Sequence, residues 1–210
     1  RYQLHTIKRL TQRLYEMEWD VSKKQRQRRL ATELPIVARV TLFGRDLDTR
    51  RTHHMLETLH PAHIQVTGKH GIGKTTFVQE TLRDLIERNT VDHLIWLHDP
   101  RSIEEIRQVL ENRLRYNSIN KGLRQYLTEK RVVSVLDEMS ELLGNTEATE
   151  DLLDDLSSAT VFLINYRYHF LRNVKGHIQL MELNDDATEA LIRDIVAKNY
   201  HSELGAFVKD

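Results

Sequence analysis

The feature that most constrains this chain is an octapeptide with the pattern G-x-x-x-x-G-K-[ST], which runs from Gly68 to Thr75. This is the P-loop pattern, whose glycines let phosphate oxygens approach the backbone closely. A β-prone run, residues 63–67, precedes the loop, and an amphipathic helical pattern, residues 76–86, follows it. Because the motif works only between a strand and a helix, this context predicts a phosphate site rather than a chance glycine-rich turn.

The residue types in the loop indicate which ligands it would hold. Backbone N–H groups at the positive end of the following helix favour anions. Lys74 would add a point charge for the β- and γ-phosphates, and Thr75 a hydroxyl for Mg²⁺. We therefore expect a phosphate-bearing ligand and Mg²⁺ at this loop. The candidate nucleotide-binding residues of the loop are Gly68, Lys69, His70, Gly71, Ile72, Gly73, Lys74, Thr75 and Thr76.

The composition narrows the class of protein. Of 210 residues, 40% are hydrophobic, which is enough for the core of one α/β domain. The 31 basic and 31 acidic residues balance, which argues against nucleic-acid binding through overall charge and leaves only a local basic patch open. There is no cysteine, so disulfides and thiolate metal sites are excluded and a cytoplasmic location is expected.

Two further sequence features bear on location and on metal binding. No apolar run approaches the ~20 residues that span a bilayer, so no membrane partner is expected. Because the chain begins with Arg1 rather than Met, we expect it to be a fragment of a longer protein. The 11 histidines are scattered without a spacing that would assemble a metal site.

A second informative stretch, residues 131–138, is a mostly apolar run that ends in Asp137 and Glu138. Ligands of open parallel sheets bind at the carboxyl ends of the strands, so we expect both acids beside the P-loop. There Asp137 would hold Mg²⁺ through its water shell, and Glu138 would accept a proton from the attacking water. The alternative, a strand that simply stops at a polar turn, is disfavoured by the P-loop upstream.

The remaining apolar runs complete an α/β pattern. Residues 93–98, 160–165 and 177–183 predict three more strands, with helical patterns between them. The five strands predict the three-layer sandwich of P-loop NTPases, with a mostly parallel sheet. Arg167 follows the strand at 160–165, where a cation would report on the γ-phosphate; the alternative is a solvated arginine.

The N-terminal segment, residues 1–34, is expected to form a helix followed by a basic linker. Its apolar stripe comprises Leu4, Ile7, Leu10, Leu14 and Met17, and the basic run comprises Lys23, Lys24, Arg26, Arg28 and Arg29. We favour a helix packed on a neighbouring domain. A coiled-coil seam or the end of an upstream effector domain stays open, since a coiled coil calls for about three heptads or more. The nucleotide-binding domain would cover residues 35–183, and residues 184–210 would begin a helical lid.

The motifs together resemble the STAND class of P-loop ATPases, the NB-ARC group of the AAA+ superfamily. The resemblance rests on the loop at 68–76, a Trp-bearing run at 93–97, the acids after Leu136, and the runs at 42–46 and 183–187. It implies that Leu42, Phe43 and Arg45 border the adenine base. An additional strand between the P-loop strand and the acidic strand also matches the additional-strand class of P-loop ATPases.

The resemblance further implies a slowly hydrolysing ATP/ADP switch domain of a larger signalling protein. In that interpretation Lys74, Glu138 and Arg167 are the catalytic residues, and Thr75 and Asp137 hold the metal. The domain would self-associate when ATP is bound, with effector and sensor domains outside this segment. The alternative is an AAA+-like motor or loader that acts on nucleic acid or protein. A third interpretation is a scaffold that binds nucleotide without hydrolysis, which the presence of Glu138 disfavours.

Overall fold

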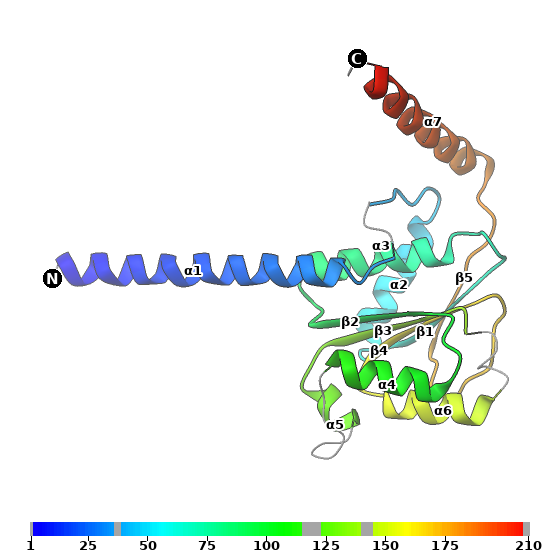
Figure 1. The fold of residues 1–210 in the computed structure, drawn as a ribbon, viewed down its shortest axis with the longest axis horizontal. Helices are drawn as coiled ribbons and strands as arrows, with labels where there is room; N and C mark the ends of the chain where they lie inside the picture. Colours follow the sequence, from blue (N-terminus) through cyan, green and yellow to red (C-terminus); the bar gives the residue numbers. More distant parts are fainter. Residues whose placement is uncertain (1, 36–38, 115–122, 140–144, 208–210) are drawn as a thin grey trace.

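A five-stranded parallel sheet organises the molecule (Figure 1). A computed structural model describes residues 2–35, 39–114, 123–139 and 145–207. The strand order is β2-β3-β4-β1-β5, and all four pairings are parallel. The strands are β1 (His63–Thr67), β2 (His93–His98), β3 (Val132–Asp137), β4 (Thr160–Asn165) and β5 (Gly176–Gln179). The predicted α/β class of P-loop NTPases is confirmed, and the strand that lies between the P-loop strand and the acidic strand is β4.

Helices cover both faces of the sheet and complete three layers (Figure 1). The helices α2, α3 and the end of α1 lie on one face, and α4, α5 and α6 on the other, while α7 extends from the body. Their bounds are α1 (Tyr2–Ala31), α2 (Asp46–Thr58), α3 (Lys74–Glu87), α4 (Ile103–Leu114), α5 (Leu123–Thr128), α6 (Thr146–Asp155) and α7 (Asp185–Phe207). No helix among the described residues is long and apolar enough to cross a membrane.

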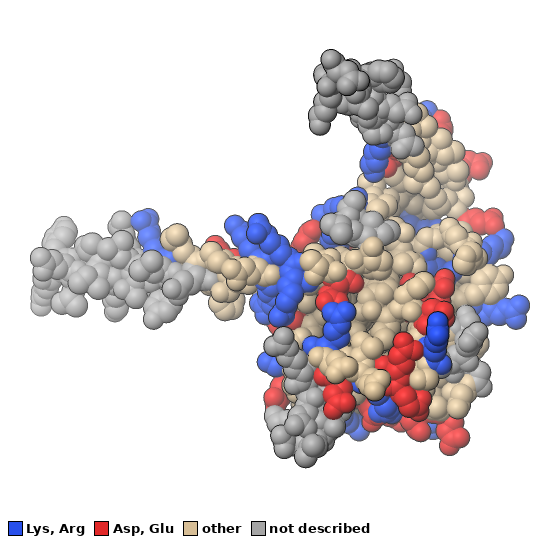
Figure 2. All heavy atoms as spheres, in the orientation of Figure 1, with Lys and Arg blue, Asp and Glu red and all other residues tan. Residues whose placement is uncertain are grey.

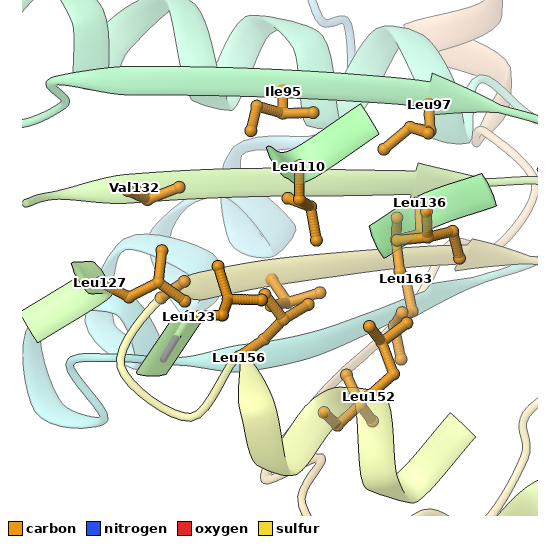
Figure 3. Packing of buried hydrophobic residues seen from close by; sticks show 14 of the residues in the cluster. Ile95, Leu97, Leu110, Leu123, Leu127, Val132, Leu136, Leu152, Leu156 and Leu163 are labelled. Carbon is orange, nitrogen blue, oxygen red and sulfur yellow. The ribbon is translucent and has the colours of Figure 1, made fainter. Parts of the chain in front are cut away.

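Two hydrophobic clusters hold the layers together. On the α4 and α6 face, Leu110 and Leu152 pack against Leu136 of the sheet (Figure 3). On the α3 face, Phe77 packs with Phe162. Successive residues of a strand face opposite sides, so a strand covered on both sides reads as a continuous apolar run. Each fully buried large apolar side chain stabilises the fold by about 1.5–3 kcal/mol.

Several helix and strand boundaries are set by local chemistry. The Ser102 hydroxyl accepts a hydrogen bond from the Glu105 N–H at 3.0 Å and thereby caps α4. The Asn184 side chain caps α7 in the same way, accepting from Ala187 N–H at 2.9 Å. Asn145 caps α6, which begins at Thr146. β5 is shorter than the strand expected at 177–183 and spans Gly176–Gln179.

The basic run was expected to form a linker, but it is part of the N-terminal helix α1. Lys, Gln and Arg are good helix formers, and nothing in the run breaks the helix before Ala31. The guanidinium of Arg26 donates to Asp92 and to Asn89, each at 2.8 Å, and Leu30 is buried in the α3-face cluster. Figure 2 shows the Lys and Arg side chains gathered where α1 reaches the body. Part of the basic run therefore attaches α1 to the domain.

Candidate nucleotide-binding site

A cavity of about 530 Å³ lies at the carboxyl ends of β1, β3 and β4, as the strand-end rule predicts. It is lined by His70, Gly71, Gly73, Lys74, Thr75, Thr76, Asp99, Asp137, Glu138, Ile164, Asn165 and Tyr166. The P-loop and both acids of the sequence prediction therefore share one cavity. A larger cavity of about 880 Å³ lies at the amino ends of the strands, and its lining contains no P-loop residue.

The backbone of the loop has the form that an anion cradle needs. Gly71 and Gly73 have φ values of 76° and 93°, in the left-handed region that favours glycine. A Cβ at either position would meet no heavy atom within 4 Å, so the space in front of the loop is open. Gly73 also caps α3, whose first turn carries no acidic residue. The positive end of the α3 dipole is therefore available to phosphate.

Lys74 lies across the loop. Its ammonium donates to the carbonyl oxygens of Gly68 and Lys69, both at 3.0 Å. Burial lowers the pKa of Lys74, while the charges of Asp137 and Glu138 act in the opposite direction. Lys69, in contrast, is exposed and pairs with Glu182 at 2.5 Å, so its side chain does not line the cavity.

Thr75 and Asp137 form a pair at the base of the cavity. The Thr75 hydroxyl donates to Asp137 Oδ2 at 3.1 Å, and Asp137 is only 1% exposed. Burial raises the pKa of Asp137, and the Thr75 hydrogen bond opposes that shift. The second carboxylate oxygen, Oδ1, is buried without a hydrogen-bond partner among the described residues. A buried oxygen of this kind is costly alone, and it suits a hard cation such as Mg²⁺.

Glu138 directly follows β3 with a φ of 61°. A residue with a side chain rarely adopts this conformation, and holding it costs about 1–3 kcal/mol. The hydrogen bond from Glu138 N–H to the Ile164 carbonyl at 3.0 Å keeps the turn in place. The Glu138 side chain remains half exposed at the cavity, where a general base would need to be.

Asn165 and His98 end the two strands on either side of β3, and neither was among the predicted site residues. Asn165 ends β4 and is 2% exposed, yet neither polar atom of its side chain has a partner among the described residues. His98 ends β2 beside Asp137 in register. Its Nδ1 lies 3.6 Å from Asp137 Oδ2, and its Nε2 lies 3.8 Å from Glu138 Oε2. A polar residue at the end of each predicted strand was the available signal.

The predicted sensor Arg167 lies outside this group. Its side chain is exposed, and its guanidinium carbon lies 5.8 Å from the centre of the Tyr166 ring. Tyr166 lines the cavity, whereas Arg167 does not. A role for Arg167 at the γ-phosphate stays a prediction.

The segment at 42–46 contacts the loop through Arg45. This side chain is 7% exposed and donates to the Met181 carbonyl at 2.7 Å and the Ile72 carbonyl at 3.2 Å. Leu42 packs on the α3-face cluster, and Phe43 is half-buried. None of the three lines the cavity described above, so their predicted contact with the base stays a prediction.

Comparison with known families identifies the region that carries these residues. Residues 46–148 match the NB-ARC domain family. This part of the chain is an NB-ARC domain. The matched range of the NB-ARC domain contains the P-loop, α3 and the acids Asp137 and Glu138. It is therefore a nucleotide-binding domain, as the sequence motifs predicted.

Several solved structures are similar to this chain. One is a chain of the Escherichia coli MS115-1 HORMA:CdnC:Trip13 complex, with a TM-score of 0.55 and 16% identity, covering 74% of this chain and 68% of that one. Another is the Aeropyrum pernix Orc1 protein in complex with DNA, with a TM-score of 0.55 and 17% identity, covering 80% of this chain and 53% of that one. A third is a chain of the Saccharomyces cerevisiae Hsp104:casein complex, with a TM-score of 0.52 and 16% identity, covering 84% of this chain and 32% of that one.

At these identities the likeness shows the fold alone. This chain spans about half of the Orc1 chain and a third of the Hsp104 chain. No curated protein matches the sequence.

Proposed function

We propose that this chain is an ATP/ADP switch that hydrolyses ATP slowly within a larger signalling or regulatory protein. The observation that carries the proposal is one cavity that joins the P-loop, the Thr75–Asp137 pair and Glu138. Membership of residues 46–148 in the NB-ARC family supports ATP or ADP as the nucleotide.

Each group has a defined part in binding. The N–H groups at the start of α3 and the Lys74 ammonium hold the phosphates. Thr75 and Asp137 hold Mg²⁺, and the unpartnered Asp137 Oδ1 supports this assignment. When bound, Mg²⁺ offsets the negative charge of the phosphate oxygens.

Hydrolysis in this proposal depends on positioning. Glu138 accepts a proton from the attacking water, and Asn165 offers an amide N–H and a carbonyl to orient the water or the γ-phosphate. Among the described lining residues Lys74 is the one permanently charged cation. An additional arginine at the transition state is worth about 10³–10⁵ in rate, so a cavity whose described lining lacks one supports slow turnover.

A change of nucleotide would be transmitted from the cavity to α7 through contacts that connect the P-loop to the start of that helix. Arg45 joins the P-loop carbonyl of Ile72 to that of Met181, which precedes α7. Gly44 lies so close to α7 that a Cβ there would be 2.7 Å from the Ala187 Cβ. We further propose that the ATP form self-associates through this domain, and that the protein acts in the cytoplasm, which its lack of cysteine favours.

Nucleotide affinity tests the proposal. We expect Lys74→Ala to weaken both ATP and ADP by about tenfold to a hundredfold, because a charge-assisted contact is lost. The matched control is Lys130→Ala, an exposed lysine at the opposite end of the sheet. Unchanged binding of both nucleotides by Lys74→Ala would refute the assignment. Turnover of Glu138→Gln equal to that of the parent would instead favour a scaffold that does not hydrolyse.

A further inference from the structure

The N-terminal helix carries an apolar stripe, and the side chains of the stripe that the structure describes are exposed. Five apolar residues of α1 recur at alternating steps of three and four: Ile7, Leu10, Leu14, Met17 and Val21. This spacing places them at positions a and d of a seam of just over two heptads. A seam this short falls below the length of a stable coiled coil, so the pairing it supports is weak. Lys24 takes the next d position and ends the stripe.

The stripe lies on a part of α1 that projects from the body (Figure 1). Where the structure describes its side chains, the stripe is exposed, with Met17 at 66% and Val21 at 54%. Hydrogen bonds to the body come from Arg26 and the residues after it. Residues 2–25 thus form about 36 Å of helix. An isolated helix is marginal in water, and an apolar face on one needs a partner to cover it.

We propose that a second copy of this chain covers the stripe, in a parallel two-stranded coiled coil. The argument for this occupant is charge complementarity. In a parallel pair, a g position faces the e position five residues on in the other helix. Here Arg13 takes g and Glu18 takes the following e, so each copy offers the acid that the base of the other requires.

Two further features of the sequence agree with this arrangement. The twofold symmetry makes the Arg13–Glu18 pair twice, and no other g–e pair along the stripe brings like charges together. The β-branched residues Ile7 and Val21 take a positions, a pattern that favours two strands in parallel coiled coils.

The attachment of α1 makes this dimer independent of nucleotide. Arg26 and Gln27 fix the end of α1 against Asp92, Asn89 and the end of α3, at the amino ends of the strands. The nucleotide cavity opens at the opposite, carboxyl ends. The dimer therefore leaves both cavities open. It is distinct from the ATP-dependent self-association proposed above, and each of the two proposals is tested independently of the other.

Sedimentation equilibrium of the 210-residue chain without nucleotide tests the proposal. We expect twice the 24.8 kDa mass of one chain, at protein concentrations where a weak dimer forms. Met17→Asp should give the mass of one chain, because it places a charge in the seam. The matched control is Trp19→Asp, which introduces the same charge at a side chain of almost equal exposure, 65%, but at an f position outside the seam. A monomeric parent, or equal masses for the two variants, overturns the proposal.

Charge reversal and crosslinking test the parallel register. Arg13→Glu and Glu18→Arg should each raise the dissociation constant about tenfold, and the double variant should restore it. The chain has no cysteine, so any disulfide formed by a variant with one introduced cysteine must join that residue in two copies of the chain. Leu14→Cys, at an a position, should form an intermolecular disulfide on oxidation, and Trp19→Cys should not. A dimer that shows no rescue by the double variant, or no crosslink through Leu14→Cys, overturns the parallel coiled coil.

Discussion

At the scale of single residues, the strand ends hold polar groups in costly positions. Among the described residues, one oxygen of the buried Asp137 and the amide of the buried Asn165 have no hydrogen-bond partner, and Glu138 is held at positive φ. Each feature lowers stability by an amount comparable to that of a lost hydrogen bond. All three residues line one cavity, as expected of a site that reserves polar groups for a ligand.

A substitution at Asn165 tests whether these polar groups serve a ligand or only the fold. We expect Asn165→Ala to leave the free energy of unfolding unchanged or slightly higher, because no described hydrogen bond is lost. In the same variant we expect ATP turnover to fall tenfold or more, by about 1.4 kcal/mol or more in transition-state stabilisation. Urea unfolding and steady-state hydrolysis measure the two effects. A large loss of stability with normal turnover would make Asn165 a core residue only.

The extent to which sequence predicts this site follows from its residues. Asp137 and Glu138 are predictable because two acids after a buried strand, downstream of a P-loop, have one natural place in a parallel sheet. His98 and Asn165 are not, because only the order β2-β3-β4-β1 and the register that sets His98 beside Asp137 reveal which strand ends meet. Arg167 was predicted at the site but does not line the cavity, because it lies two positions past the end of β4.

At the scale of elements, one ion-pair group attaches α1 to the domain. Asp92 Oδ1 lies 2.8 Å from a nitrogen of Arg131 and 2.8 Å from one of Arg26. The hydrogen bonds from Arg131 are the main reason that the pKa of Asp92 falls from 3.8 to about 2. The helix that sequence analysis ended before a linker is thus extended by contacts between residues far apart in the chain, which periodicity alone does not encode.

The depressed pKa predicts how this attachment depends on pH. The stabilisation by Asp92 is fully present above its unfolded-state pKa near 4 and is lost as the pH falls through about 2. We expect Asp92→Asn to be less stable than the parent by about 1 kcal/mol at pH 5, since solvent screens the partly exposed pair, and the difference to shrink to a few tenths of a kcal/mol near pH 2. Urea unfolding across this range measures it.

The matched control for Asp92 is Glu189→Gln, which breaks an exposed i,i+4 pair with Arg193 on α7. Such pairs contribute about 0.3–0.5 kcal/mol, so this variant should differ little from the parent at any pH. A difference for Asp92→Asn that does not change between pH 5 and pH 2 would show that the charge of Asp92 is not what stabilises the attachment.

At the scale of the whole molecule, Arg45 is one of two described side chains that join the P-loop to the approach to α7, and the other is the exposed Lys69, which pairs with Glu182. Its planar guanidinium donates to two carbonyls at once, those of Ile72 and Met181, a geometry that a lysine ammonium does not reproduce. Because α7 projects from the body, this contact and the packing of Gly44 on Ala187 determine how α7 is held (Figure 1). A loop that shifts on binding phosphate would therefore act on α7 through Arg45.

Arg45→Lys tests this coupling while keeping the charge. In the parent, we expect ADP to slow amide hydrogen exchange in the first turns of α7, far from the phosphate groups. In Arg45→Lys, ADP should still protect α3, where the phosphates bind, and the protection of α7 should disappear. The exchange of α3 serves as the internal control, since it shows that the variant still binds nucleotide. Equal protection of α7 in the two proteins would place the coupling elsewhere, and no response of α7 in the parent would remove this helix from the switch.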